Sequence, residues 1–138
     1  MNKKFSVLIK KKILKFNKTI FVESDKSISH RSLLIASQCI GLSTLTNVLE
    51  SQDVINTITC LKKLGVKILK RNKKYYIYGN GLGSFITPHK NELYVGNSGT
   101  LARMLIALIS THPNLKVKIS GDISLNKRDM KRIIIPLS

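Results

Sequence analysis

The chain lacks an apolar run of the roughly 20 residues that a membrane-crossing helix requires. Near the N-terminus, only residues 5–9 separate Lys4 from Lys10, which is too short for the apolar region of a secretory signal. This segment also lacks the arginine and serine richness of a transit peptide. We therefore expect a cytoplasmic protein without a membrane partner.

Cysteine is scarce, with Cys39 and Cys60 as the only two. Both lie inside apolar helical patterns, and neither is near a histidine or in a Cys-x-x-Cys spacing. The pattern therefore favours neither a metal site nor a disulfide framework. We expect two reduced thiols in or near the core, and no bound metal.

Carboxylates are scarce too: 7 Asp and Glu face 24 Lys and Arg, a formal charge of +17 over 138 residues. Such an excess permits nucleic acid, an anionic membrane surface or acidic small molecules as partners. The basic runs at residues 10–12 and 70–74 are not interleaved with stacking aromatics, apart from Tyr75 and Tyr76. We prefer a solvated basic face and expect no nucleic-acid partner. A small basic nucleic-acid-binding module stays open as the alternative from another class.

Strand-like and helix-like segments alternate over the length of one domain. Helices are predicted to begin near Lys26, after Ser51, after residues 96–100, and after Asp122; the last one includes Met130, Ile133 and Ile134. Strands are predicted at residues 12–22, 43–49, 66–69, 74–78, 93–95 and 115–119.

The pattern also repeats. Ser27 precedes Arg31 by four residues, Gly99 precedes Arg103 by four, and the two arginines are 72 residues apart. This repetition predicts two similar β-α-β-α-β-β units. A chain that ends soon after the second unit is interpreted as cut short.

The first polar cluster is DKSISHR at residues 25–31. The free N–H groups of a helix that begins here form an anion site, to which Lys26 adds a point charge and Ser27 a hydroxyl. Arg31 offers a planar fork of donors to a phosphate or carboxylate. An ordinary capped helix is the alternative, and His30, which lacks a carboxylate or cysteine partner, is interpreted as structural.

Two more clusters follow. GNSGT at residues 96–100, with Arg103 one turn later, has glycines that let a ligand approach the backbone before a helix; a plain turn with a helix cap is the alternative. Residues 121–130 place basic side chains between a strand end and a helix. By itself this third cluster decides nothing.

Together the three clusters resemble the 5-enolpyruvylshikimate-3-phosphate (EPSP) synthase family. Its Asp-Lys-Ser-Ile-Ser-His-Arg stretch is complete at residues 25–31, and its Gly-Asn-Ser/Ala-Gly-Thr stretch with a following arginine is present at residues 96–103. Its Gly-Asp-x-Ser-Leu-x-x-Arg-x-Met stretch is present at residues 121–130. Three matches in order and register across almost the whole chain make the resemblance specific.

The resemblance implies an α/β (α+β) enolpyruvyl transferase-like fold. Each of two similar domains is then an inside-out α/β barrel of three β-α-β-α-β-β units, with substrates in the cleft between the domains. Residues 1–22 would hold the first strands of the other, largely missing domain. Residues 23–138 would hold about two units of the N-terminal domain, truncated at the C-terminus and so an incomplete barrel.

The implied reaction transfers the enolpyruvyl group of phosphoenolpyruvate to the 5-hydroxyl of shikimate 3-phosphate through a tetrahedral intermediate. The products are 5-enolpyruvylshikimate 3-phosphate and phosphate, on the route to chorismate and the aromatic amino acids. The resemblance implies no metal and no organic cofactor, and a monomer in the full-length form. The groups that move protons would belong to the missing half. We therefore assign no catalytic residue here and expect the chain alone to be an inactive fragment.

The resemblance also implies site residues. Those for shikimate 3-phosphate are Lys26, Ser27 and Arg31; those for phosphoenolpyruvate are Lys26, Gly99 and Arg128; Asn97, Thr100 and Arg103 would shape the phosphoenolpyruvate loop. Both helix N-terminal turns should then lie on the same side of the fold, with Arg128 near Lys26.

Three departures from the family pattern stand out, and the most serious is that the family chain is much longer. Glu-Ser at residues 23–24 replaces the usual Pro-Gly, and Arg-Asp at residues 128–129 replaces Arg-Pro. The alternative inside the superfamily is a transferase that acts on UDP-N-acetylglucosamine. That enzyme would show Lys-Asn in place of Lys-Ser at residues 26–27, and a loop cysteine that this chain lacks.

Overall fold

The computed structural model describes residue 8 and residues 23–138. The strand predicted at residues 12–22, and the assignment of residues 1–22 to another domain, lie outside the described residues. The helices are α1 (Lys26–Gln38), α2 (Gln52–Lys63), α3 (Gly99–Ile109), α4 (Ile123–Asn126) and α5 (Lys131–Leu137). The strands are β1 (Ile40–Thr46), β2 (Lys67–Arg71), β3 (Lys74–Asn80), β4 (Glu92–Tyr94) and β5 (Lys118–Ser120).

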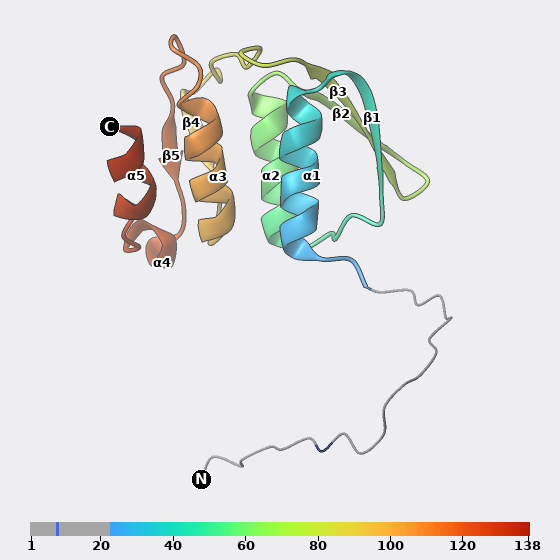
Figure 1. Cartoon of the computed structure of the whole chain (residues 1–138), viewed down its shortest axis with the longest axis horizontal. Coiled ribbons are helices and arrows are strands. Elements are labelled where there is room, and N and C mark those ends of the chain that lie inside the picture. The colour runs from blue at the N-terminus through green and yellow to red at the C-terminus, as the bar shows by residue number, and fades with distance from the viewer. Residues whose placement is uncertain (1–7, 9–22) are drawn as a thin grey trace.

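A three-stranded antiparallel sheet in the order β1-β3-β2 is covered on one face by α1 and α2 (Figure 1). Alternation along β3 explains this layering, because Tyr75 and Ile77 are buried while Tyr76 and Tyr78 are only half-buried. A second sheet pairs β4 with β5 in parallel and lies with α3 beside this layer. One apolar core runs through both parts, and it includes Leu33, Leu61 and Leu105.

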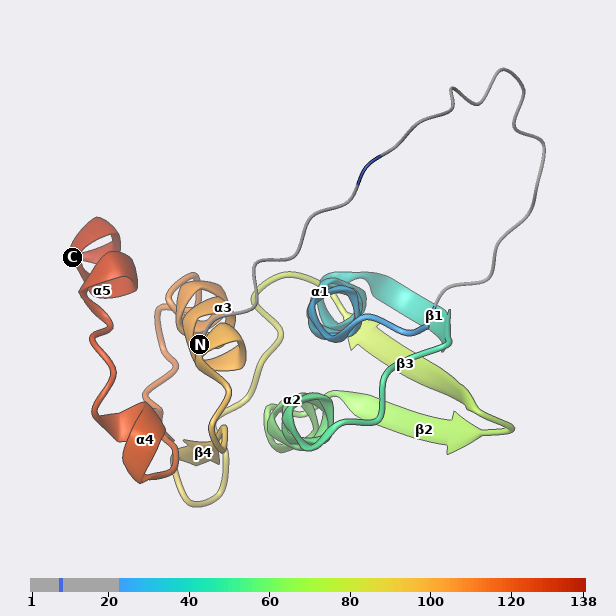
Figure 2. The ribbon, with the colours of Figure 1, turned by 90° about the horizontal axis from the view of Figure 1, so that it is seen from below.

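The three long helices run in the same direction. In Figure 1 the N-terminal ends of α1, α2 and α3 lie at the lower end of the molecule, where α4 also lies. Figure 2 looks at this end and shows α1, α2 and α3 nearly end-on. The fold therefore gathers helix N-termini, with their free N–H groups, at one end of the molecule.

The predicted starts of the first two helices, near Lys26 and after Ser51, are confirmed. The Asp25 carboxylate accepts a hydrogen bond of 2.7 Å from the Ile28 N–H and caps α1. Ser51 occupies the cap position of α2, although its side chain makes no capping bond. Gly65, at φ +93°, ends α2 in the left-handed conformation that glycine adopts without a steric penalty.

The two strands predicted at residues 66–69 and 74–78 are present as β2 and β3, and they form an antiparallel pair. β2 and β3 are joined at Asn72 and Lys73, whose φ values of 47° and 59° are positive. Two consecutive residues of positive φ twist a tight turn in the same sense as the flanking strands. Asparagine tolerates this conformation better than most residues do.

The single helix expected after Asp122 is wrong, because the segment forms two helices. Asp122 caps α4 through a 2.7 Å bond from the Leu125 N–H, and α4 then ends at Asn126. The Asp129 carboxylate accepts a 2.7 Å bond from the Lys131 N–H. A short side chain that binds the neighbouring backbone competes with continued helix, so α5 begins only at Lys131.

All five described strands have bounds that differ from those predicted, and the differences are largest for β1 and β5. β1 covers Ile40–Thr46 rather than residues 43–49. β5 covers only Lys118–Ser120 rather than residues 115–119, because its partner β4 offers three residues for pairing.

The two thiols differ. Cys60 is buried as expected, and this burial raises its pKa to about 11. The expectation of a near-core position is wrong for Cys39, which is exposed because it follows the last residue of α1, where the buried face of the helix ends.

A substitution at Gly79 would test how closely α1 packs against the sheet. A Cβ atom at this position would lie 2.1 Å from the Cys39 carbonyl oxygen and 2.5 Å from that of Ala36. We expect Gly79→Ala to lower the free energy of unfolding by about 1–3 kcal/mol, since backbone atoms would have to move. Urea unfolding followed by circular dichroism measures this, with Asn80→Ala at the exposed neighbour as the control. Equal stability of the two variants would contradict the packing described here.

Candidate functional site

A polar cavity of about 420 Å³ lies at the end of the molecule where the helix N-termini gather. Its lining residues come from the first residue of α1, the first turn of α2, the loop before α3 and the first turns of α3, and the segment after α4. The lining residues are Lys26, Asp53, Asn97, Ser98, Gly99, Thr100, Arg103 and Arg128. Parts of the chain up to 102 positions apart thus form one pocket, which we call the N-terminal pocket.

On the α1 side, Lys26 forms an ion pair with Asp53 of α2. The Lys26 Nζ and Asp53 Oδ2 atoms are 3.0 Å apart, and the side chains are 51% and 25% exposed. A pair this exposed contributes little to stability, about 0–1 kcal/mol. Its effect is to fix where the ammonium lies at the edge of the pocket.

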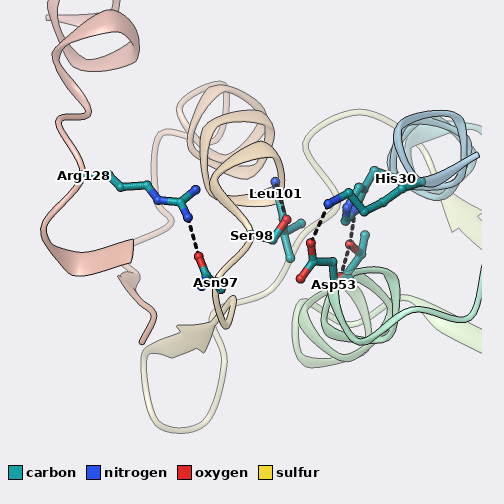
Figure 3. Close-up of polar contacts among 8 residues, drawn as sticks. His30, Asp53, Asn97, Ser98, Leu101 and Arg128 are labelled. Carbon is teal, nitrogen blue, oxygen red and sulfur yellow. Dashed lines mark hydrogen bonds and ion pairs between the residues drawn. The ribbon is translucent and has the colours of Figure 1, made fainter. Parts of the chain in front are cut away.

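Two glycines, Gly96 in the loop before α3 and Gly99 at its first position, allow close approach to the backbone. A Cβ atom on Gly96, which has φ +62°, would lie 2.4 Å from the Asn56 side-chain nitrogen. A Cβ atom on Gly99 would lie 2.8 Å from Nη1 of Arg128. Ser98 caps α3 by accepting a 3.2 Å bond from the Leu101 N–H (Figure 3). The loop is therefore held between α2 and Arg128 without a side chain at Gly99 to block the pocket.

Arg128 reaches the pocket from the segment that follows α4. Its Nη2 group donates a short hydrogen bond to Oδ1 of Asn97, which the dashed line in Figure 3 marks. This bond aims the guanidinium at the loop before α3. Asn97 thus positions a cation that lies 31 residues further along the chain.

The structure brings together the three residues assigned to phosphoenolpyruvate, Lys26, Gly99 and Arg128. The expectation that the starts of α1 and α3 lie on the same side of the fold is confirmed as well. Ser27 and Arg31 do not line this pocket. Ser27 is half-buried, whereas Arg31 is exposed and borders a separate, apolar cavity between α1 and α3.

The charges in the N-terminal pocket favour anions. Lys26, Arg103 and Arg128 supply three positive charges and Asp53 supplies one negative charge, which gives a net charge of +2. The N-terminal end of the α3 dipole adds to this field. The one carboxylate among the lining residues is already paired with a lysine. The pocket is therefore suited to holding a multiply charged anion rather than to moving protons.

His30 does not line the pocket, and it is fully buried. Its Nδ1 atom is 2.6 Å from Oγ1 of Thr57, which ties α1 to α2. Burial lowers the pKa of His30; the nearby Asp53 opposes this shift, and Lys26 reinforces it. A neutral, buried imidazole that joins two helices fits the structural role inferred from the sequence.

His30 should make stability depend on pH. An unfolded histidine titrates near pH 6.5, and burial lowers the pKa of His30 in the folded state. As the pH falls from 7 towards 5, His30 of the unfolded chain becomes protonated before His30 of the folded chain does. Protonation therefore stabilises the unfolded state, and the free energy of unfolding should decrease. Urea midpoints measured across this range test the effect. His30→Gln should flatten the slope, while Asn80→Gln, at an exposed site without a titratable group, should leave it unchanged. A slope unaltered by His30→Gln would contradict the assignment.

Asp53 is the member of the pocket that sequence reasoning missed. The sequence pattern places Asp53 only in the first turn of the helix predicted after Ser51, and its partner Lys26 is 27 residues away along the chain. One signal was available: parallel helices of a β-α-β-α unit begin at the same edge, so charged residues in their first turns are neighbours.

Among residues 23–138, no helix is long and apolar enough to span a membrane.

Comparison with known proteins places residues 10–138 in the family described as EPSP synthase (3-phosphoshikimate 1-carboxyvinyltransferase). The 3-phosphoshikimate 1-carboxyvinyltransferase of Syntrophomonas wolfei is 42% identical over 118 residues, which cover 86% of this chain and 27% of the relative. The enzyme of that name from Alkaliphilus oremlandii is 44% identical over 126 residues, covering 91% of this chain and 29% of the relative.

Solved structures agree with these relatives. An EPSP synthase from Acinetobacter baumannii matches with a TM-score of 0.75 and 36% identity, over 85% of this chain and 26% of that one. The expected enolpyruvyl transferase-like α/β fold is thereby confirmed. The chain spans 26% to 29% of the length of these three proteins.

Proposed function

The chain belongs to the EPSP synthase family, and we propose that it supplies part of the substrate site of a 3-phosphoshikimate 1-carboxyvinyltransferase. In this proposal, the enolpyruvyl group of phosphoenolpyruvate passes to the 5-hydroxyl of shikimate 3-phosphate, and phosphate is released. Residues 23–138 form about two repeat units of the N-terminal domain. The observed order α1-β1-α2-β2-β3 followed by β4-α3-β5-α4 supports this division.

One observation carries the proposal: Lys26, Gly99 and Arg128, which come from three separate motifs, line the same pocket of net charge +2. Phosphoenolpyruvate has a phosphate and a carboxylate close together, so it needs two neighbouring cations. Lys26 would act as a point charge, and the Arg128 guanidinium would act as a planar donor. Gly99 would allow the ligand to approach the start of α3.

Shikimate 3-phosphate is assigned to Lys26, Ser27 and Arg31. Lys26 is common to both substrates, and it lies in the first turn of α1 together with Ser27. During addition and elimination, Lys26 and Arg128 would neutralise the anionic charge that the two phosphates bring together. Asn97 would hold Arg128, while Thr100 and Arg103 would shape the loop.

The remaining parts of the proposal concern partners and location. We propose small anionic metabolites rather than nucleic acid as ligands, a cytoplasmic location where such metabolites occur, and a monomeric full-length form. The Lys-Ser pair at residues 26–27 supports the shikimate substrate over UDP-N-acetylglucosamine.

A titration of the ¹⁵N-labelled chain by two-dimensional NMR tests this function. Phosphoenolpyruvate and shikimate 3-phosphate should shift the amide signals of residues 26–31 and 97–100, whereas shikimate, which keeps the carboxylate but lacks the phosphate, should shift them far less. Removing the phosphate removes charge-assisted hydrogen bonds, each contributing about 1.5–3 kcal/mol. Shifts confined to other surfaces, or identical responses to shikimate and its phosphate, would contradict the proposed site.

A further inference from the structure

The N-terminal pocket contains a group that does not fit simple anion binding. Asp53 places a carboxylate among Lys26, Arg103 and Arg128, and a carboxylate repels an anionic ligand. Its position in the first turn of α2 gives one explanation for its presence, because an acidic residue near a helix N-terminus stabilises the helix. The contacts of Asp53 indicate a second role.

The Lys26 ammonium depends on Asp53 for its position. Within residues 23–138, the 3.0 Å contact with Asp53 Oδ2 is the polar contact that Lys26 Nζ makes. Lys26 is the first residue of α1, and half of its side chain is exposed. Without the pair, this long side chain would sample many rotamers that point away from the pocket.

Asp53 itself lies on a well-anchored part of the fold. Its carbonyl oxygen accepts a 3.2 Å bond from the Thr57 hydroxyl, and Thr57 Oγ1 is also 2.6 Å from the buried His30. Val54, the next residue, is fully buried in the core. The carboxylate therefore extends from a helix turn that is fixed against α1, and it can hold a lysine side chain that would otherwise rotate freely.

We propose that Asp53 is a positioning residue of the N-terminal pocket: it holds the Lys26 ammonium where an anionic ligand needs it, and so supports anion binding despite its own charge. The inference rests on the proposed function, because it assumes that Lys26 binds phosphoenolpyruvate. Ordering a free side chain on binding weakens affinity by about 2-fold to 12-fold. Because Asp53 orders the Lys26 side chain before the ligand binds, this loss of affinity is avoided. The proposal requires that the affinity saved in this way exceeds the affinity lost through repulsion between the Asp53 carboxylate and the ligand.

A double-mutant cycle separates these two effects. Phosphoenolpyruvate is titrated into the purified chain, into Asp53→Asn, into Lys26→Met and into the double variant, with affinity measured by NMR. We expect Asp53→Asn to weaken binding by about 2-fold to 12-fold when Lys26 is present, and to have no such effect in the Lys26→Met background. Asp53→Glu should recover part of the loss. If Asp53→Asn strengthens binding in both backgrounds, Asp53 merely repels the ligand. If it weakens binding equally in both, Asp53 does not act through Lys26. Either result overturns the proposal.

A second measurement needs no ligand. NMR relaxation of the Lys26 side-chain carbons should report an ordered side chain in the unaltered chain, and mobility like that of the exposed Lys62 in Asp53→Asn. Glu50→Gln, which removes the carboxylate of the Lys70–Glu50 ion pair outside the pocket, is the matched control and should leave Lys26 ordered. If the chain binds no phosphoenolpyruvate, the proposed function fails and this measurement decides the role of Asp53. A loss of stability in Asp53→Asn with unchanged Lys26 mobility would leave only the helix-stabilising role and overturn the proposal.

Discussion

Incubated with phosphoenolpyruvate and shikimate 3-phosphate, the purified 138-residue chain is expected to release no phosphate above the blank. In the part of the chain that the structure describes, the N-terminal pocket offers cations and a single carboxylate, and that carboxylate is paired with Lys26. Each positioned group that moves a proton contributes a rate factor of about 10²–10⁴, and the pocket supplies none that is free. An open site should lower the rate further, because it leaves the bound phosphates exposed to water. Contact between two charges in bulk water is worth only about 1 kcal/mol.

The assay follows phosphate release with and without a separately expressed segment that corresponds to the remainder of the relatives. Activity in the combined sample should disappear with Lys26→Ala and persist with Lys62→Ala, an exposed lysine of α2 outside the pocket. Turnover by the 138-residue chain alone that Lys26→Ala abolishes would show that the chain supplies its own proton-transfer groups. The assignment of no catalytic residue to this chain would then be wrong.

Arg128→Ala should weaken phosphoenolpyruvate binding about 10-fold to 150-fold, and shikimate 3-phosphate binding far less. The guanidinium lies beside Gly99 and is held by Asn97. Under the proposed assignment it binds phosphoenolpyruvate and not shikimate 3-phosphate, so its removal would take a charge-assisted hydrogen bond from one ligand only. Such a bond contributes about 1.5–3 kcal/mol, which gives the stated range. In Arg128→Ala, Asn97 loses the hydrogen bond that it accepts from the guanidinium. Because Asn97 is exposed, water can replace this bond, so its loss adds no large penalty of its own.

Isothermal titration calorimetry of both ligands against the chain combined with the separately expressed remainder, in which the site is closed, measures the difference. Arg132→Ala is the matched control, since this arginine is exposed on α5 and lies outside the pocket. An equal loss for the two ligands in Arg128→Ala would show that the arginine contributes a general field rather than a contact with phosphoenolpyruvate.

Local chemistry made the helix starts predictable from the sequence. Asp25 and Ser98 cap α1 and α3 through bonds to residues three positions ahead, and Gly65 ends α2 through its own backbone conformation. These contacts depend on neighbours in the sequence, so residue type and spacing suffice to predict them. Three motifs in register likewise placed Lys26, Gly99 and Arg128 in one site, which the shared pocket supports.

Contacts that depend on how elements pack could not be predicted in the same way. The Lys26–Asp53 pair joins two helices, and the Arg128–Asn97 bond joins two loops. The break between α4 and α5 depends on a competition between Asp129 and the helical backbone, which apolar periodicity does not reveal. The exposure of Cys39 follows from where α1 ends, a boundary that the sequence defines only within a few residues.

The shared direction of α1, α2 and α3 has a kinetic consequence. Aligned helix dipoles add at the end where Lys26, Arg103 and Arg128 also lie, so the field there extends beyond the pocket itself. An anion that diffuses past this end is drawn towards it before any contact forms, and dissolved salt screens that attraction over about 10 Å at 0.1 M. Rising ionic strength should therefore slow the encounter of ligand and chain much more than it hastens the escape of a bound ligand.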